Sequence, residues 1–431
     1  MTAHPGGDPG RAWVYTATVK GFYQKVHRWT GLALQAIFFA VPWLTVGGHP
    51  AVLVDLPARR VYAFGEVFSA QDTVFLVLIS LASAFALFFF TALFGRLWCG
   101  YACPQTVWLE EWIRPLEKWI EGERGVRMHR DRGPWTFDKA WRKAAKWTVY
   151  AAISGAIAGT FVSWFSPART LWTGGASAEA YGWVLGLGAL MFWDFAWFRE
   201  QFCNYLCPYA RIQGALCDEE SLVVAYLADA GEPRKQGGAC IDCKKCVTVC
   251  PAGIDIREGF QLECITCGRC IDACTGVMGK LGHPSLIRYT SLKKTRWIRP
   301  RTVVYGALLS GVALAFVGLL ATKHELRVNV NRAPGSLYVV DADGWTRNTF
   351  LLQVINEDLE PEDFTVAIDG LPAEGTFNVP ALSLDAGEDT TVPLVVRLPP
   401  GTSSRTLPIT VTVRSHDDQV AVPTTFKTPG A

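Results

Sequence analysis

Residues 240–251 read CIDCKKCVTVCP, and residues 264–274 read CITCGRCIDAC. Each stretch has the spacing C-x2-C-x2-C-x3-C, in which a chain wraps around one [4Fe–4S] cube and sends its fourth cysteine to a second cube. The spacing predicts that one cluster is held by Cys240, Cys243, Cys246 and Cys274. It predicts that the second is held by Cys250, Cys264, Cys267 and Cys270. Two full copies of this pattern disfavour zinc ribbons, and two neighbouring clusters indicate a path for single electrons rather than a purely structural pair.

A different cysteine pattern occurs twice upstream, as CGYACP at 99–104 and CNYLCP at 203–208. The flanking stretches 88–105 and 192–209 also match, which indicates a repeated two-span hairpin with a thiol pair at one end. The C-x3-C spacing places both sulfurs on one face if the helix continues to the second cysteine. The proline can then follow at a helix end or in the first turn of a new helix.

Four thiols converging from two hairpins predict a reactive site made of Cys99, Cys103, Cys203 and Cys207. Such a group could bind Cu(I), cycle between dithiol and disulfide, or hold a third iron–sulfur cluster. The alternative is that the four act as small apolar fillers. Two pairs in register, each followed by proline, argue against that alternative, whereas the lone Cys217 is interpreted as filler.

Composition indicates a membrane protein with a lipid environment. Of the 431 residues 50% are hydrophobic, the formal net charge is only +2, and no basic block suggests nucleic acid. Five apolar runs approach the length of about 20 residues that crosses a bilayer. These runs are Trp29–Val46, Thr73–Gly95, Trp147–Phe165, Tyr181–Phe198 and Val303–Ala321.

The basic residues predict the orientation of these spans. Segments 1–28, 47–72, 96–146, 166–180 and 199–302 contain 4, 2, 11, 1 and 15 lysines and arginines. By the positive-inside rule, the N-terminus, the 96–146 loop and the 199–302 segment are cytoplasmic, and the C-terminal part lies on the other side. All 13 cysteines then fall on the reducing side of the membrane.

From about Glu325 the chain changes to short alternating runs that turn residues separate at about ten-residue spacing, which predicts a small antiparallel β-sandwich. The sandwich has no cysteine and is interpreted as a docking or spacer domain. The predicted organisation is a cytoplasmic N-terminus at 1–28, a four-helix membrane region with both C-x3-C-P repeats at 29–230, a cytoplasmic 2[4Fe–4S] ferredoxin domain at 231–302, a fifth transmembrane helix at 303–321, and the sandwich at 325–431.

Several stretches together resemble the FixG/CcoG/RdxA family of accessory proteins for assembly of cbb3-type cytochrome c oxidase. They are GRLWCGYACPQTVW, NYLCPYARIQG, the whole of 240–274, and SLIRY at 285–289. The resemblance runs from about Tyr15 to the end of the chain. It implies a multi-pass protein of the bacterial inner membrane with a periplasmic immunoglobulin-like C-terminal domain.

The resemblance also implies a copper reductase. Electrons would pass through two [4Fe–4S] clusters and reduce Cu(II) to Cu(I), with the four paired cysteines carrying the copper chemistry. The implied partners are the oxidase assembly machinery and copper-handling proteins.

Other functions stay open, because polyferredoxin subunits of periplasmic nitrate and nitrous-oxide systems also carry C-x3-C-P pairs. One is an electron-transfer subunit that exchanges electrons with quinone. Another is an assembly scaffold whose clusters are structural. The electron donor and the oligomeric state, a homo-oligomer included, are unassigned. His27, His129 and His283 could assist copper or could be surface or interfacial residues.

Overall fold

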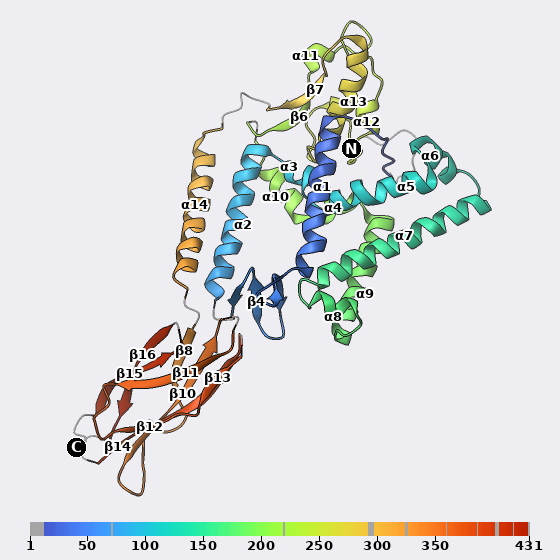
Figure 1. The fold of residues 1–431 in the computed structure, drawn as a ribbon. Helices are drawn as coiled ribbons and strands as arrows, with labels where there is room; N and C mark the ends of the chain where they lie inside the picture. Colours follow the sequence, from blue (N-terminus) through green and yellow to red (C-terminus); the bar gives the residue numbers. More distant parts are fainter. Residues whose placement is uncertain are drawn as a thin grey trace. The chain divides into compact units, whose positions relative to one another are not determined.

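The computed structural model describes residues 13–69, 72–218, 220–291, 297–323, 326–358, 360–385, 387–400, 405–416 and 418–429. The chain divides into two compact units, Met1–Pro42 with Val77–Ala315, and Trp43–Leu76 with Phe316–Ala431. Each unit is described by itself, with its elements labelled in Figure 1.

The five predicted spans are largely helical. They correspond to α1 (Phe22–Ala40), α2 (Thr73–Phe94), α7 (Phe137–Val162), α9 (Ala178–Trp193) and α14 (Pro300–Ala321). Within the described ranges, two helices, α2 and α14, are long and apolar enough to cross a membrane. These two helices run side by side in Figure 1, and the rings of Phe88 and Tyr305 lie 5.6 Å apart between them.

The boundaries of the predicted spans need correction. The helix of the first span begins seven residues early, and Pro42 is followed by strand β1 (Thr45–Val46), because proline has no N–H to continue the helical pattern. The helix of the third span begins at Phe137, where Thr136 accepts the backbone N–H of Lys139 at 3.2 Å and caps α7. The last residues of the fourth span form the π-helical turn η3 (Asp194–Phe198) rather than regular helix.

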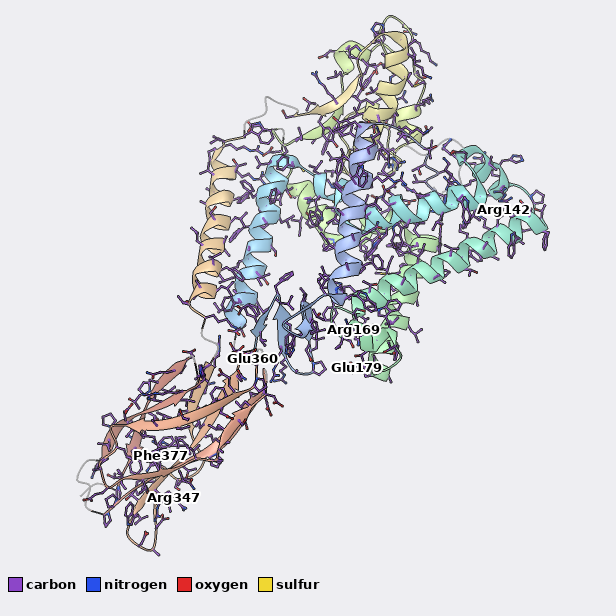
Figure 2. All side chains as sticks on the ribbon, viewed as in Figure 1. Arg142, Arg169, Glu179, Arg347, Glu360 and Phe377 are labelled. Atoms are coloured by element: carbon purple, nitrogen blue, oxygen red, sulfur yellow. The ribbon has the colours of Figure 1, made fainter. Side chains whose placement is uncertain are left out.

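Charged residues mark the two ends of the α7–α9 hairpin. Figure 2 shows Arg142 near the start of α7 and places Arg169 and Glu179 at the opposite end, around α8 (Ala168–Trp172). The apolar stretch of the hairpin lies between them.

Short helices carry the thiol pairs and the loop that follows the first pair. They are α3 (Leu97–Tyr101), α4 (Pro104–Trp108), η2 (Leu109–Ile113), α5 (Arg114–Glu121), α6 (Arg124–Arg132), η4 (Phe202–Leu206) and α10 (Pro208–Leu216). Because α3 and α10 pack with the ferredoxin region in one unit, the two cysteine patterns belong to a single body.

The ferredoxin region combines two strands with short helices. Strands β6 (Val223–Tyr226) and β7 (Ile287–Thr290) pair antiparallel and enclose the cysteine-rich chain, so the fold extends upstream of residue 231. The helices are α11 (Ala228–Gly231), α12 (Lys245–Thr248), η5 (Ile256–Glu258), α13 (Arg269–Met278) and η6 (Gly279–Leu281). Buried Val224, Ile254, Ile271 and Ile287 form its core, with five of the eight predicted cluster cysteines packed in or against it.

The second unit contains the predicted β-sandwich. One sheet has the order β12-β14-β10-β8 with β9 beside β10, and the other has the order β13-β11-β15-β16. The strands are β8 (Leu326–Arg332), β9 (Val339–Val340), β10 (Thr346–Asn356), β11 (Glu362–Asp369), β12 (Thr376–Asn378), β13 (Leu382–Leu384), β14 (Asp389–Leu398), β15 (Thr406–Arg414) and β16 (Gln419–Lys427). Inward-facing Phe350, Leu394, Val411 and Phe426 are fully buried between the sheets.

From Trp43 onward, the loop between α1 and α2 also belongs to this unit. It forms the turn η1 (Val41–Trp43), the pair β1 and β2 (His49–Pro50), and the meander β3 (Val52–Asp55), β4 (Arg60–Ala63) and β5 (Glu66–Phe68). An ion pair of 3.3 Å joins Arg60 of β4 to Asp389 of the sandwich.

Candidate metal centre

The eight cysteines of the two long motifs line two cavities in groups of four. One cavity is lined by Cys240, Cys243, Cys246 and Cys274. The other is lined by Cys250, Cys264, Cys267 and Cys270, with Cys246 also reaching its wall. These are the groups that the spacing predicts, and four thiol donors around each cavity fit a [4Fe–4S] cluster. The assignment of each cysteine as an iron ligand stays a prediction.

Both motifs use the same backbone conformation to bring their cysteines together. Asp242 and Lys244 have φ of 54°, and the equivalent Thr266 and Gly268 have φ of 58° and 73°. A helix begins directly afterwards in each copy, α12 and α13. Positive φ at two positions of each C-x2-C-x2-C segment tightens the loop, and only Gly268 is a residue that adopts it without strain.

The second cavity lies close to the helices that follow the first thiol pair. Burial raises the pKa of Cys250, although backbone N–H groups of Ala252, Gly253 and Ile254 donate to its sulfur and oppose this shift. Arg114 of α5 donates to the carbonyl of Pro251 at 3.1 Å. Burial raises the pKa of Cys267 to about 12, so coordination of a metal would release its proton.

The two thiol pairs do not lie on continuous helices, so the condition for a shared helical face is not met. Helix α3 ends at Tyr101, and Cys103 is the extended N-cap of α4, with proline in its first turn. Cys207 has the same place before α10. The physical reason is that a residue before proline disfavours the helical conformation. Of the two placements open to the proline, the structure has the first turn of a new helix.

The fold nevertheless brings the four thiols together. Cys99 and Cys103 come from the first repeat and Cys203 and Cys207 from the second, and electrostatic interactions link the two pairs. Burial raises the pKa of Cys99 to about 12 and also raises the pKa of Cys103 and of Cys203. In the described part of the chain, which includes all 13 cysteines, no disulfide joins any of them. Within the described ranges, no group of three or more His, Cys, Asp or Glu side chains is close enough to hold a single metal ion.

The first thiol pair packs directly on the loop of the second cavity. Cys99 forms a buried cluster with Ile265 and Cys267. A Cβ atom at Gly100 would lie 2.5 Å from the carbonyl oxygen of Ile265 and 3.0 Å from the Cα of Cys267. Tyr101 donates from its hydroxyl to the carbonyl of Cys267 at 3.1 Å. The segment CGYAC therefore touches the segment CITCG backbone to backbone.

Three buried or half-buried polar residues surround the thiols and could not be found from cysteine spacing. The Cys99 thiol donates to Oε1 of Gln213 at 2.9 Å, and Nε2 of Gln213 donates to the hydroxyl of Tyr209 at 2.8 Å. Arg96 hydrogen-bonds to Cys99 and acts electrostatically on Cys203 and on Cys264. Its positive charge thus lies within range of both the thiols and the second cavity.

The histidines take different places. His27 is buried, and its Nδ1 lies 2.8 Å from Oε1 of Glu111, between α1 and η2. This makes it an interfacial residue, one of the two alternatives. His129 is exposed on α6, and His283 is exposed after η6.

Family comparisons agree with this arrangement. Residues 198–237 and 232–292 match a 4Fe-4S dicluster domain. Residues 76–125 and 179–216, which contain the two C-x3-C-P repeats, match a 4Fe-4S binding domain. Residues 316–429 match a domain described as the IG-like fold at the C-terminus of FixG. The chain is therefore an iron–sulfur electron-transfer protein with an immunoglobulin-like C-terminal domain.

Curated relatives give the family. The chain is 37% identical to RdxA of Cereibacter sphaeroides, over 84% of this chain and 83% of RdxA. It is 34% identical to the nitrogen fixation protein FixG of Rhizobium meliloti, over 89% of this chain and 84% of FixG. The chain belongs to the FixG/RdxA family. It is also 23% identical to the ferredoxin-type protein NapH of Haemophilus influenzae, over 57% of this chain and 85% of NapH.

Proposed function

We propose that the protein passes electrons through two [4Fe–4S] clusters to Cu(II) bound at Cys99, Cys103, Cys203 and Cys207, and so produces Cu(I) for assembly of a cbb3-type oxidase. The contact between CGYAC and CITCG supports this proposal most directly. It puts the candidate copper thiols against the loop that holds Cys264 and Cys267. An electron then has a short path from the second cluster site to the thiols.

Each part of the thiol site has a task in this scheme. The thiols bind copper as thiolates, and because burial raises the pKa of Cys99, Cys103 and Cys203, these three would release their protons as copper binds. Soft thiolates favour the reduced ion, so one electron added to each Cu(II) gives a Cu(I) that the site retains. The hydrogen bond from Cys99 to Gln213 orients the thiol, and Arg96 offsets the negative charge of the thiolates.

The proposed location follows from the charge pattern and the apolar helices. We place the protein in the inner membrane as a multi-pass chain, with its N-terminus and ferredoxin region cytoplasmic and its sandwich periplasmic. Copper-handling proteins and the oxidase assembly machinery are the proposed partners. The sandwich offers the surface for docking.

The test measures single-turnover reduction of Cu(II). Anaerobically purified protein is reduced, freed of reductant and mixed with Cu(II), and Cu(I) is trapped with a colorimetric chelator. The wild type should form Cu(I) rapidly as the iron–sulfur absorbance returns. The variant with Cys103→Ser and Cys207→Ser should keep its iron but lose the fast phase. Equal fast phases in the two proteins would refute the role of the thiols, and the matched control is Cys217→Ser, outside both pairs.

A second candidate function is quinone-linked electron transfer, as an alternative or as the source of the electrons. The observation that favours it is a cavity of about 610 Å³ along α2, lined mainly by apolar residues such as Phe90, Phe94 and Trp98. This volume is in the usual range of about 300 to 1,000 Å³ for small-molecule sites. Tyr101 and Gln213 also line it, and they contact the Cys267 carbonyl and the Cys99 thiol. Quinone extracted stoichiometrically from purified protein would support this function, and its absence from protein purified in mild detergent would count against it.

A further inference from the structure

A second large cavity is lined mainly by polar and charged residues, unlike the apolar cavity along α2. It measures about 500 Å³, and the N-terminal segment 16–21, α1, η2, α5, α6 and the start of α13 enclose it. Seven lysine or arginine side chains and three glutamates line it, which leaves an excess of positive charge. Neither the cluster sites nor the thiols use this space.

The glutamates of the cavity are already engaged by partners. Glu110 accepts from both Arg114 and Arg269, the latter reaching it from the second cysteine motif. Glu111 lies against His27, and Glu123 pairs with Lys118 at 2.7 Å. The three carboxylates of the lining are therefore already paired. The remaining cations of the lining, Lys20, Lys25 and Arg28, give the cavity its excess of positive charge.

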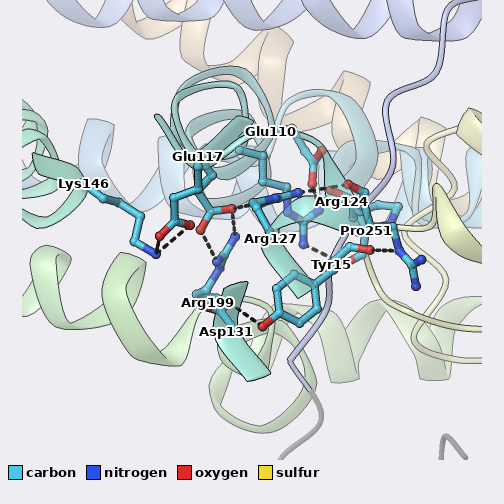
Figure 3. Close-up of polar contacts among 12 residues, drawn as sticks. Tyr15, Glu110, Glu117, Arg124, Arg127, Asp131, Lys146, Arg199 and Pro251 are labelled. Atoms are coloured by element: carbon cyan, nitrogen blue, oxygen red, sulfur yellow. Dashed lines mark hydrogen bonds and ion pairs between the residues drawn. The ribbon is translucent and has the colours of Figure 1, made fainter. Parts of the chain in front are cut away.

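Three arginines in the wall are nearly fully buried. Arg114, Arg127 and Arg269 are 6%, 5% and 7% exposed. Figure 3 shows Arg127 held by Glu117 of α5, at 2.7 Å. Within the described part of the chain, the Nε–H of each of these three arginines has no hydrogen-bond acceptor. These Nε atoms are themselves buried, so what the three arginines bring to the cavity wall is positive charge rather than open donors.

Exposed cations complete the cavity on the solvent side. Lys20 lies on the N-terminal segment, and Lys25 and Arg28 lie on α1. The buried guanidinium groups are held in place by acceptors of the chain, such as Glu117 and the carbonyl of Pro251, and contribute fixed positive charge. The exposed lysines and Arg28 supply mobile cations that can contact a phosphate directly. The volume exceeds that of a single inorganic phosphate and accommodates a phosphate with attached groups or a second phosphate.

We propose that this cavity binds a phosphate-bearing anion. The chemistry is shared by two sources, an anionic phospholipid headgroup at the membrane surface and a soluble polyphosphate. The ligand would lie beside Arg269, which precedes Cys270, and Arg114, which donates to the carbonyl of Pro251. It would therefore add negative charge beside the second cluster site. The site does not depend on the thiols or on copper.

The test compares binding to two charge-matched variants of the full chain in neutral detergent, after lipid has been removed. One variant is Lys20→Ala with Lys25→Ala, in which both changed side chains are exposed and line the cavity. The control is Lys280→Ala with Arg288→Ala, in which both side chains are exposed and do not line it. The probes are inorganic pyrophosphate, followed by calorimetry, and cardiolipin in mixed micelles, followed by retained phosphorus per chain.

We expect the cavity variant to bind at least one probe with at least about tenfold lower affinity than the wild type, because each lysine near an anionic group contributes about 1 kcal/mol. The control should bind both probes like the wild type. A change for cardiolipin alone assigns the site to a lipid headgroup. A change for pyrophosphate alone assigns it to a soluble ligand. The proposal is overturned if the wild type binds neither probe more tightly than the cavity variant, or if the control loses as much affinity.

Discussion

Replacement of Gly100 by alanine tests whether the first thiol pair really rests on the loop of the second cavity. The added Cβ would lie 2.5 Å from the carbonyl oxygen of Ile265, whereas ordinary contacts begin at 3.4 Å, so the two segments must separate by about 0.9 Å. The obstacle is backbone and cannot rotate away. Overpacking of this kind costs about 1–3 kcal/mol.

A matched control removes the effect of helix propensity. Gly276 also lies in a helix, α13, and a Cβ there would meet nothing within 4 Å. Both substitutions gain about 0.5–1 kcal/mol because alanine is the better helix former. The difference between the two variants therefore isolates the contact, and the Gly100 variant should be less stable than the Gly276 variant by about 1–3 kcal/mol.

The assay is unfolding of the detergent-solubilised protein, followed by tryptophan fluorescence and by iron–sulfur absorbance, together with single-turnover Cu(II) reduction. We expect Gly100→Ala to unfold earlier and to slow reduction, because the thiols move away from the loop. Gly276→Ala should match or exceed the wild type in stability and reduce copper at the same rate. Equal stability and equal rates for the two variants would refute the proposed contact.

Three further predictions concern other parts of the chain. Burial opposes the charge of Glu117, but Arg199, Lys146 and Arg127 outweigh it and lower its pKa to about 2. This value lies below the pKa of about 4.3 for glutamate in the unfolded chain, so ionised Glu117 stabilises the folded protein by on the order of 3 kcal/mol. The stabilisation is fully present above about pH 4.3 and is lost as the pH falls toward 2. Glu117→Gln should therefore lower the free energy of unfolding at pH 7 and make it depend less on pH between about 4.3 and 2. The same pH dependence in the variant and the wild type would contradict this. Asp272 accepts hydrogen bonds from the backbone N–H groups of Tyr23 and Gln24 at the start of α1. Asp272→Ala should therefore destabilise the protein by about 0.5–2 kcal/mol, measured by thermal unfolding. An unchanged unfolding temperature would show that this cap does not stabilise the fold. A reporter fused after residue 431 should be active outside and one fused after residue 235 inside, and activity of both on one side would overturn the five-span topology.

The sequence predicts those features that local spacing determines. Two copies of one cysteine spacing lead to two loops with the same positive φ positions, and the cysteines of each predicted set line one cavity. Their role as iron ligands stays a prediction. The sandwich follows from its alternating runs, and strand β8, for example, covers the alternating stretch LRVNVNR at 326–332. Strand β16 is harder to predict because Pro423 lies within it. In the described part of the chain β16 is the edge strand beside β15, and proline is tolerated on edge strands.

Features that depend on tertiary contact could not be predicted. Gln213 meets Cys99 across 114 positions of the chain, and no spacing rule links them. Arg96 looks like an ordinary basic residue at the end of a span, yet it is 5% exposed and acts on both thiol pairs. The meander of β3, β4 and β5 was hidden in a loop because its strands are only three or four residues long.

The central claim is that the thiols at 99, 103, 203 and 207 bind copper. The most direct measurement is iron and copper per chain in anaerobically purified protein, for the wild type and for the variant with serine at all four positions. We expect about 8 iron atoms in both proteins, from two [4Fe–4S] clusters, and copper in the wild type alone. About 12 iron atoms in the wild type and about 8 in the variant would contradict it, because the paired thiols would then hold a third cluster.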